Sequence, residues 1–360
     1  MSAKTAPLIV PVFLPHAGCP HRCVFCDQHA VTGTATAIPN TGDIQRAMEV
    51  YGDNRKPNNR TVQIAFYGGN FLGLPKETIR SMLAVATRFV QAGRADSIRF
   101  STRPDTVDDE RLALISEYPV STVEIGAQSM SDRVLDRSRR GHSAADTIQA
   151  VRILKELGFE TGVQMMVGLP GDDKKTVLQS GQRIGALAPA FVRIYPTIVL
   201  ADSPLGRWYT QGRYRPLDLD GAVDLTKQLL ILFHSYHVPV IRMGLQASAD
   251  LETGSAVMAG PYHPAFGHLV YEALFFDAAT TSFGTHSPDE IIDIVVHPRN
   301  ISKLRGLKNR NLQRLIDRFH PHQVNLLSDP GINQDSIIVN HHCCPVYGEG
   351  INTAISGASS

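Results

Sequence analysis

Short apolar runs alternate along the chain with longer segments in which apolar residues recur every three or four positions. The first pattern is typical of buried β-strands, and the second is typical of amphipathic α-helices. Their regular alternation favours parallel βα units. We expect strands at residues 8–14, 62–66, 97–101, 122–125, 162–167, 191–195 and 238–241, and helices at residues 41–51, 76–91, 108–117, 144–157, 174–186 and 219–236.

Glycine and polar residues gather directly after these strands rather than before them. Three cysteines follow the first strand, Gly68 and Gly69 follow the second, Arg103 follows the third and Gln128 follows the fourth. Function in a parallel βα barrel lies on the loops after the carboxyl ends of its strands. These residues are therefore expected to open onto one face of a barrel.

The C-terminal part of the chain predicts a smaller unit. Residues 291–296 and 323–327 are apolar runs typical of strands, and residues 300–319 between them are typical of helix. This α+β segment resembles a KH-like RNA-binding module, although its turn sequence Gly306-Leu-Lys-Asn lacks the second glycine of a KH loop. Six cationic side chains in this segment could contact an RNA backbone, or they could simply form a solvated helix face. They are Lys303, Arg305, Lys308, Arg310, Arg314 and Arg318.

Length and charge limit the classes of protein that the chain can represent. Its 360 residues, 43% of them hydrophobic, suffice for a barrel-sized core at 1–275, a small α+β domain at 276–340 and a flexible tail at 341–360. A net charge of +1 gives no overall attraction to nucleic acid or membrane. The sequence shows neither a bilayer-spanning apolar run nor a signal peptide at its N-terminus, so we expect a cytoplasmic protein without membrane contact.

Three of the five cysteines, Cys19, Cys23 and Cys26, occupy a C-x3-C-x2-C spacing. A single disulfide would leave a reactive third thiol, so the spacing favours a metal centre. Zinc would need a fourth ligand, for which His16, His21 and His29 are candidates. A 4Fe-4S cluster takes one thiolate per iron, and three cysteines leave one iron open to another ligand.

The remaining two cysteines lie in the sequence His341-His342-Cys343-Cys344. Imidazole and thiolate are good metal ligands. Adjacent side chains on an extended backbone point in opposite directions, however, so the four cannot easily meet one ion. We interpret this cluster as fortuitous.

The cysteine loop, with Phe25 directly before its third cysteine, resembles the C-x3-C-x-aromatic-C loop of the radical S-adenosylmethionine (radical SAM) superfamily. The resemblance implies a partial barrel of six βα units, a (β/α)6 TIM-type barrel, and a 4Fe-4S cluster held by Cys19, Cys23 and Cys26. It further implies that SAM chelates the open iron through its amino and carboxylate groups. An electron from a flavodoxin- or ferredoxin-like donor then cleaves SAM, and the resulting 5′-deoxyadenosyl radical takes a hydrogen atom from the substrate.

The same resemblance assigns SAM contacts to residues after the next strands. Gly68 and Gly69 correspond to the first two residues of the family's Gly-Gly-Glu motif, in which the backbone binds the SAM amino group, and this chain has Asn70 in place of Glu. Ser101 and Arg103 correspond to contacts with the ribose or carboxylate, and Gln128 corresponds to a SAM contact near the fourth strand.

The neighbouring pair Arg139-Arg140 stands before Gly141-His142. These arginines could reach the SAM carboxylate or an anionic substrate. A solvated arginine pair at a helix end is the alternative.

Longer stretches narrow the resemblance. Phe-Tyr-Gly-Gly-Asn-Phe at 66–71 and Val-Glu-Ile-Gly-Ala-Gln-Ser-Met at 123–130 resemble the radical SAM domain of the elongator catalytic subunit. Its stand-alone bacterial cousins also share Gly-Pro-Tyr-His-Pro-Ala-Phe-Gly, here at 260–267. The resemblance implies modification of a tRNA or another RNA.

Two departures limit the elongator resemblance. The elongator cysteine spacing is wider, and too few residues follow position 267 for an acetyltransferase domain. One alternative is oxidation of a small molecule, as in the oxygen-independent coproporphyrinogen dehydrogenases, which share the compact cysteine loop. Another is a non-catalytic metal- and RNA-binding protein.

Overall fold

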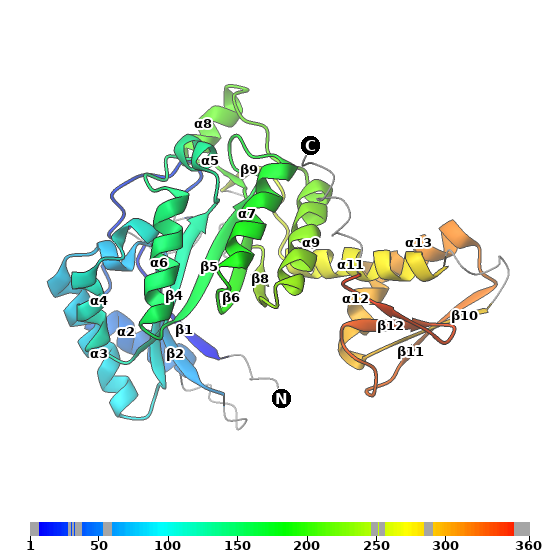
Figure 1. Ribbon diagram of the computed structural model, residues 1–360, viewed down its shortest axis with the longest axis horizontal. Helices are drawn as coiled ribbons and strands as arrows, with labels where there is room; N and C mark the ends of the chain where they lie inside the picture. The colour runs from blue at the N-terminus through cyan, green and yellow to red at the C-terminus, as the bar shows by residue number, and fades with distance from the viewer. Residues whose placement is uncertain are drawn as a thin grey trace. The chain divides into compact units, whose positions relative to one another are not determined.

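The computed structural model describes residues 7–27, 30, 32, 38–52, 60–245, 251, 256–283 and 291–348 (Figure 1). The chain divides into a barrel unit, residues 1–218 and 238–264, and a second unit, residues 219–237 and 265–360. The domain boundary expected at residue 275 lies inside helix α11, Phe266–Phe283. None of the helices in the described part of the chain is both long and apolar enough to cross a membrane.

A seven-stranded parallel sheet forms the barrel unit. Its order is β1-β2-β3-β4-β5-β6-β8, so the first six strands lie side by side in the order of the sequence. β1 and β8 are the two edges and do not pair, which leaves the barrel open. The predicted partial TIM-type barrel is confirmed, with strands β1 Leu8–Phe13, β2 Val62–Tyr67, β3 Ser97–Thr102, β4 Val120–Gln128, β5 Glu160–Val167, β6 Phe191–Pro196 and β8 Val240–Met243.

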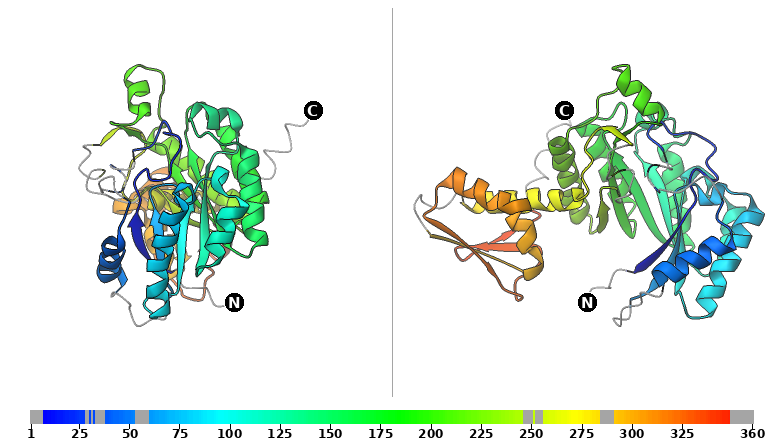
Figure 2. Two further views of the ribbon diagram at one scale, coloured as in Figure 1. Left: turned by 90° about the vertical axis from the view of Figure 1, so that its left-hand side faces the viewer. Right: turned by 180° about the vertical axis from the view of Figure 1, so that it is seen from behind.

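Helices connect these strands and cover the outer face of the curled sheet, as the two opposite views show (Figures 1 and 2). Several begin at a side-chain cap: Ser143 and Asp146 form a reciprocal capping box at α6, and Asp108 and Asp173 cap α4 and α7. Such caps satisfy backbone N–H groups that lack a partner in the first turn. The helices of the barrel unit are α2 Thr41–Ala47, α3 Lys76–Gln91, α4 Asp109–Ser116, α5 Asp132–Arg137, α6 Ala144–Glu156, α7 Lys174–Ala186 and α8 Pro204–Thr210.

Aromatic packing fixes the loop that follows β2. A short 3-10 turn, Phe71–Gly73, places the Phe71 ring 5.0 Å from Phe66 and 4.5 Å from Phe100, measured between ring centroids. All three rings are fully buried. Stacking of this kind adds about 1 kcal/mol per pair beyond the burial of apolar area. The loop after β2 is therefore held firmly on the barrel.

The second unit contains a four-stranded sheet in the order β11-β10-β12-β13. β10 and β11 are parallel, and β12 and β13 are antiparallel to their neighbours. The predicted strand–helix–strand segment is present, with the helical stretch divided in two at Gly306. The elements are α9 Leu219–Ser235, α11 Phe266–Phe283, β10 Ile291–Val296, α12 Ile301–Arg305, α13 Arg310–Phe319, β11 Gln323–Ser328, β12 Ser336–Val339 and β13 His342–Pro345.

One difference from the sequence analysis concerns the expected tail. Residues 341–348 are not a loose end, because His342–Pro345 pair along β12 as the edge strand β13. Hydrogen bonding to the sheet satisfies their backbone, which a tail would leave to water. Residues 349–360 lie outside the described part of the chain.

Candidate functional site

The cysteine loop, residues 14–27, runs over the carboxyl ends of the barrel strands. Its beginning is tied to the loop after β2, because Leu14 N donates to Tyr67 O at 2.6 Å and His16 N donates to Gly68 O at 3.3 Å. Its end is tied to two more loops, through Val24 N to Ser138 O at 3.1 Å and Leu205 N to Val24 O at 2.8 Å. Three segments, the loop after β2, the segment after α5 and the start of α8, therefore hold the cysteine loop in place.

Glycine is required where the cysteine loop meets the loop after β2. A Cβ atom at Gly69 would lie 2.5 Å from the Leu14 carbonyl oxygen, and a Cβ atom at Gly18 would overlap the Asn70 carbonyl oxygen. Gly68 has a φ of 95°, a conformation that L side chains rarely adopt. Loop packing by itself explains the Gly-Gly pair, so the predicted contact of Gly68 and Gly69 with a cofactor stays a prediction.

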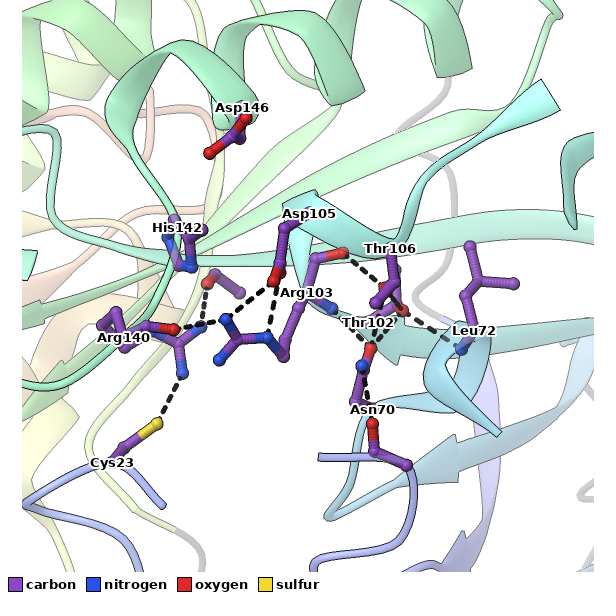
Figure 3. A network of polar contacts seen from close by, with 12 residues as sticks. Cys23, Asn70, Leu72, Thr102, Arg103, Asp105, Thr106, Arg140, His142 and Asp146 are labelled. Carbon is purple, nitrogen blue, oxygen red and sulfur yellow. Dashed lines mark hydrogen bonds and ion pairs between the residues drawn. The ribbon is translucent and has the colours of Figure 1, made fainter. Parts of the chain in front are cut away.

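Asn70 joins three loops through its side-chain amide (Figure 3). Its Nδ2 donates to Gly18 O in the cysteine loop at 2.9 Å. Its Oδ1 accepts from Arg103 N at 2.9 Å, from Thr102 Oγ1 at 2.7 Å and from Thr106 Oγ1 at 3.0 Å. The side chain is completely buried. Asn70 is thus a positioning residue for the cysteine loop, a role that the sequence comparison with Gly-Gly-Glu did not suggest.

All five cysteines fall within the described residues, and none of them forms a disulfide. Cys19 is exposed, Cys23 is buried and Cys26 is partly buried. His16, Cys19 and His21 line a pocket of about 350 Å³ at the surface of the loop. Phe25 packs on a buried apolar cluster that includes Val24 and therefore anchors the segment between the second and third cysteines.

Arg140 reaches the cysteine loop from the segment after α5. Its Nη1 donates to Cys23 Sγ at 3.1 Å, and its Nη2 donates to Gly126 O at 2.6 Å (Figure 3). The side chain is only 6% exposed. The solvated-pair interpretation is therefore wrong for Arg140, because burial against a thiol replaces contact with water. Arg139 remains exposed, with its guanidinium above the Trp208 ring.

Arg103 lies beside Arg140. Its guanidinium binds Asp105 through two hydrogen bonds of 2.9 Å and also donates to Arg140 O. Arg103 Nη1 and Arg140 Nε are buried nitrogens that have no hydrogen-bond partner in the described structure. Buried donors are normally satisfied, so each of these atoms calls for an acceptor. A carboxylate or another anion would supply one.

The two arginines also set the electrostatics of the loop. Desolvation raises the pKa of the Cys19 thiol although its surface is exposed, Cys23 acts in the same direction, and Arg140 and Arg103 oppose them. For His142, burial and then the same two arginines lower the pKa to about 3. His142 is therefore neutral at physiological pH, and its Nε2 lies 3.3 Å from Ala127 O. The two guanidinium groups favour anionic ligands in this region, although at Cys19 burial outweighs them and raises the pKa of the thiol.

Gln128 ends β4 in a left-handed conformation, with a φ of 65°. The β4–β5 register shifts at this point, between Gly126 and Gln128. Bulges of this kind re-aim side chains and are common beside functional sites. A Cβ atom at Gly126 would lie 3.0 Å from Gln128 Nε2 and 3.5 Å from Arg140 Nη2, so the amide of Gln128 and the guanidinium of Arg140 both pack around Gly126.

Ser101 belongs to a different group of side chains, which lines the concave side of the sheet. Its hydroxyl accepts from Gln164 Nε2 at 3.0 Å. The same Gln164 nitrogen donates to the Glu124 carboxylate at 2.9 Å. Ser101 therefore contacts this polar group and makes no hydrogen bond to Arg103 or Arg140 in the described structure.

Glu124 is the centre of that polar group. Its fully buried carboxylate is contacted from four other strands: by Tyr67 Oη at 2.8 Å, Arg99 at 3.2 Å, Arg193 at 3.0 Å and Gln164. Burial and then the Glu124 charge raise the pKa of Tyr67 above its usual value. Closed barrels fill this space with layers of branched aliphatic side chains. Here it is ionic, with two guanidinium groups around one carboxylate.

The structure thus brings Cys23, Arg103, Gln128 and Arg140 together and ties Gly68 and Gly69 to the cysteine loop. It does not bring Cys343 and Cys344 into this site, because both belong to β13 in the second unit. Cys344 Sγ instead accepts from Ser282 Oγ at 2.7 Å. His29, one of the candidate zinc ligands, lies outside the described residues.

The three cysteines are suitable ligands for a metal cluster because of their chemistry, although they do not enclose a single metal position. Within the described residues, no three His, Cys, Asp or Glu side chains surround a single point as ligands of one ion. A 4Fe-4S cluster binds each thiolate at a different iron, so its three cysteines need not surround a single point. The unpartnered nitrogens of Arg103 and Arg140 fit a carboxylate-bearing ligand beside Cys23.

An open parallel barrel with clustered thiols at the carboxyl ends of its strands defines the class of this molecule. The radical SAM superfamily model matches residues 13–184, and the model of the radical SAM C-terminal domain matches residues 189–275. The chain belongs to the radical SAM superfamily and is an enzyme. Members of this superfamily use SAM and a 4Fe-4S cluster.

The individual proteins that resemble this chain do so at low sequence identity. An uncharacterised protein of Methanocaldococcus jannaschii is 27% identical over 225 residues, which cover 59% of this chain and 68% of that protein. A tRNA uridine(34) acetyltransferase of Dehalococcoides mccartyi is 23% identical over 232 residues, which cover 55% of this chain and 50% of the relative. The chain therefore spans about half the length of this tRNA-modifying relative.

Among solved structures, Elp3 of the archaeon Methanocaldococcus infernus superimposes with a TM-score of 0.59 at 18% identity. The superposition covers 75% of this chain and 63% of the Elp3 chain. This likeness shows that the two proteins share a fold.

Proposed function

We propose that Cys19, Cys23 and Cys26 hold a 4Fe-4S cluster with one open iron, and that this enzyme modifies an RNA, with tRNA as the first candidate. The observation that carries the proposal is the buried contact between Arg140 and Cys23, at 3.1 Å, beside two unpartnered guanidinium nitrogens. When bound, the cluster and SAM supply an electron and a 5′-deoxyadenosyl radical that abstracts hydrogen from the substrate.

The residues of this chain would bind and orient the ligands in that chemistry. Arg103 and Arg140 offer buried N–H donors for the SAM carboxylate. Gln128, aimed by the bulge at the end of β4, offers an amide to the same ligand. Gly68 and Gly69 present backbone close to the cysteine loop, and Ser101 offers a hydroxyl on the concave face.

The substrate would be bound over the concave face of the barrel. The ionic group around Glu124 gives this face two cations for one anion, Arg99 and Arg193 against Glu124. These charged groups are largely buried and paired with one another, so they form a rigid floor under the concave face rather than free contacts for a phosphate. The tRNA-modifying relative supports tRNA in particular, and a small-molecule substrate is the alternative that the test below distinguishes.

We further propose a flavodoxin- or ferredoxin-like electron donor and a cytoplasmic location, where thiols stay reduced for metal binding. Both proposals rest on the cysteine loop. Its surface position, with Cys19 exposed, would let a donor protein approach the cluster.

The test is anaerobic turnover of SAM by the full chain. The protein is reconstituted with iron and sulfide, supplied with SAM and a strong reductant, and assayed for 5′-deoxyadenosine with and without bulk tRNA. We expect about four irons per chain, nucleoside formation, and a faster rate with tRNA.

The matched control compares cysteines in the two units. Cys23→Ala is expected to lose the cluster and SAM cleavage, whereas Cys343→Ala, an exposed cysteine of β13, is expected to keep both. Full cluster content and SAM cleavage in Cys23→Ala would contradict the assignment. SAM cleavage that a small molecule stimulates and tRNA does not would contradict the RNA substrate.

A further inference from the structure

Positive charge is concentrated in one short segment of the second unit. Residues 298–322 contain seven Lys or Arg residues and a single Asp, in a chain whose net charge is only +1. This segment comprises α12, α13 and the turn between them, residues 306–309. Such local charge asymmetry is the electrostatic footprint of a polyanion-binding surface.

Some cationic side chains of this segment already contact other protein groups, whereas others are free to contact a ligand. Lys303 Nζ lies above the Tyr271 ring at 4.4 Å and donates to Asn300, and Arg314 lies above the Phe276 ring at 3.7 Å. Arg305 and Lys308 are exposed and form no ion pair within the described residues. Arg299 is likewise exposed without an ion pair in the described structure, but of these three only Arg305 and Lys308 lie at the 306–309 turn, Arg305 directly before it and Lys308 within it.

The surroundings of this turn resemble those of a KH module. β10 and β11 are parallel neighbours, and the chain between them forms α12, the turn and α13. In KH modules a G-x-x-G turn clamps the backbone of about four nucleotides of single-stranded nucleic acid. The corresponding sequence here is Gly306-Leu307-Lys308-Asn309, with Asn in the place of the second glycine.

The backbone conformation of Asn309 compensates for the missing glycine. Asn309 has a φ of 62° and a ψ of 21°, in the left-handed region. Asparagine visits this region more readily than most non-glycine residues. The turn can therefore take a shape for which glycine would be the usual residue.

A buried carboxylate fixes the turn from inside the second unit. Glu272, 1% exposed, accepts from Leu307 N at 3.0 Å and from Arg310 Nε at 2.8 Å. A Cβ atom at Gly306 would lie 2.9 Å from this carboxylate, so glycine is needed for the approach. Since the turn is held in one shape before any ligand arrives, binding would require little further ordering.

We propose that the 306–309 turn, with Arg305 and Lys308, binds the phosphate backbone of single-stranded RNA. The inference deepens the proposed function, because it assigns to the second unit the capture of the RNA on which the barrel unit would act. An anionic membrane surface is the other polyanion to consider. The large exposed apolar side chain within the turn is Leu307, at 38% exposure, whereas a membrane-binding surface needs a wider apolar face.

The experiment measures binding of a fluorescein-labelled single-stranded RNA of 12 nucleotides to the full chain by fluorescence anisotropy, between 50 and 300 mM KCl. Each lost phosphate contact on a single strand lowers the slope of log K against log salt by about 0.7. The Arg305→Ala/Lys308→Ala variant should therefore lose about 1.4 in slope and bind about tenfold more weakly at 150 mM.

The matched control is Arg46→Ala/Arg152→Ala, which removes two exposed arginines from α2 and α6 in the barrel unit. It should bind RNA as the unmodified chain does. No RNA binding by the unmodified chain, or an equal loss in both double variants, would overturn the proposal. Binding to phosphatidylserine vesicles but not to RNA would overturn it in favour of a membrane surface.

One further variant separates this inference from the proposed function. Cys23→Ala should bind the RNA as the unmodified chain does, because the turn and Cys23 belong to different units. If the unmodified chain binds RNA through Arg305 and Lys308 but cleaves no SAM, the proposed function fails and the RNA-binding inference stands.

Discussion

Replacement of Asn70 should loosen the cysteine loop. In Asn70→Ala the N–H of Arg103 and the carbonyl of Gly18 lose their partner. The hydroxyls of Thr102 and Thr106, 3.1 Å apart, can still pair with each other. Each buried polar group left without a partner costs about 1–3 kcal/mol, so two of them predict a loss of about 2–6 kcal/mol in the free energy of unfolding.

Asn70→Asp distinguishes the donor from the acceptor side of this amide. The carboxylate keeps an acceptor for Arg103 N but places an oxygen against the Gly18 carbonyl, where Nδ2 now donates at 2.9 Å. It also introduces a charge at a position with no exposure to water. We expect Asn70→Asp to destabilise at least as much as Asn70→Ala.

Urea unfolding gives the free energies, and hydrogen exchange read by mass spectrometry shows whether residues 14–27 open more often. Asn311→Ala is the matched control, since Asn311 is also fully buried but donates to Glu272 O in the second unit. It should destabilise its own unit without changing exchange in the cysteine loop or iron content after reconstitution. Wild-type loop exchange in both Asn70 variants, with a stability change under about 0.5 kcal/mol, would refute the reasoning.

Three further changes test other parts of the structure. Gly69→Ala should cost at least about 2 kcal/mol in urea unfolding and expose residues 14–27 to exchange, because its Cβ would meet the Leu14 carbonyl. The folded pKa of His142, about 3, lies below its unfolded value of about 6.5, so stability should fall as pH drops through this window. Between pH 7 and pH 5 the loss from this residue should be about 2 kcal/mol, and His142→Gln should remove it. Glu272→Ala should destabilise the second unit by about 2–3 kcal/mol, because it leaves the N–H of Leu307 and the partly exposed Arg310 without their partner. An unchanged urea midpoint would contradict this.

The barrel was predictable from sequence because each strand is a short apolar run that is buried against helices. The same logic missed α11, Phe266–Phe283, whose buried residues lie on all sides of the helix and therefore show no amphipathic period. It also placed the end of β4 at residue 125. The strand continues to Gln128 through Gly-Ala-Gln, a sequence that suggests a turn, because neighbouring strands pair with it.

The site was only partly predictable, because its decisive contacts connect distant residues. Nothing local distinguishes Arg139 from its neighbour Arg140, yet one lies exposed above Trp208 and the other is buried against Cys23, 117 positions earlier. The hydrogen bonds of the Asn70 amide likewise depend on Gly18 and Arg103, which lie next to it only after folding. Spacing identified the cysteines, whereas their surroundings required the fold.

The most direct test of the central claim is electron paramagnetic resonance of the reduced, reconstituted protein before and after addition of SAM. An open iron in a cluster held by Cys19, Cys23 and Cys26 predicts the signal of a single reduced 4Fe-4S cluster whose g values change when SAM binds. A signal that SAM leaves unchanged, or a protein that takes up zinc and gives no cluster signal, would contradict the account.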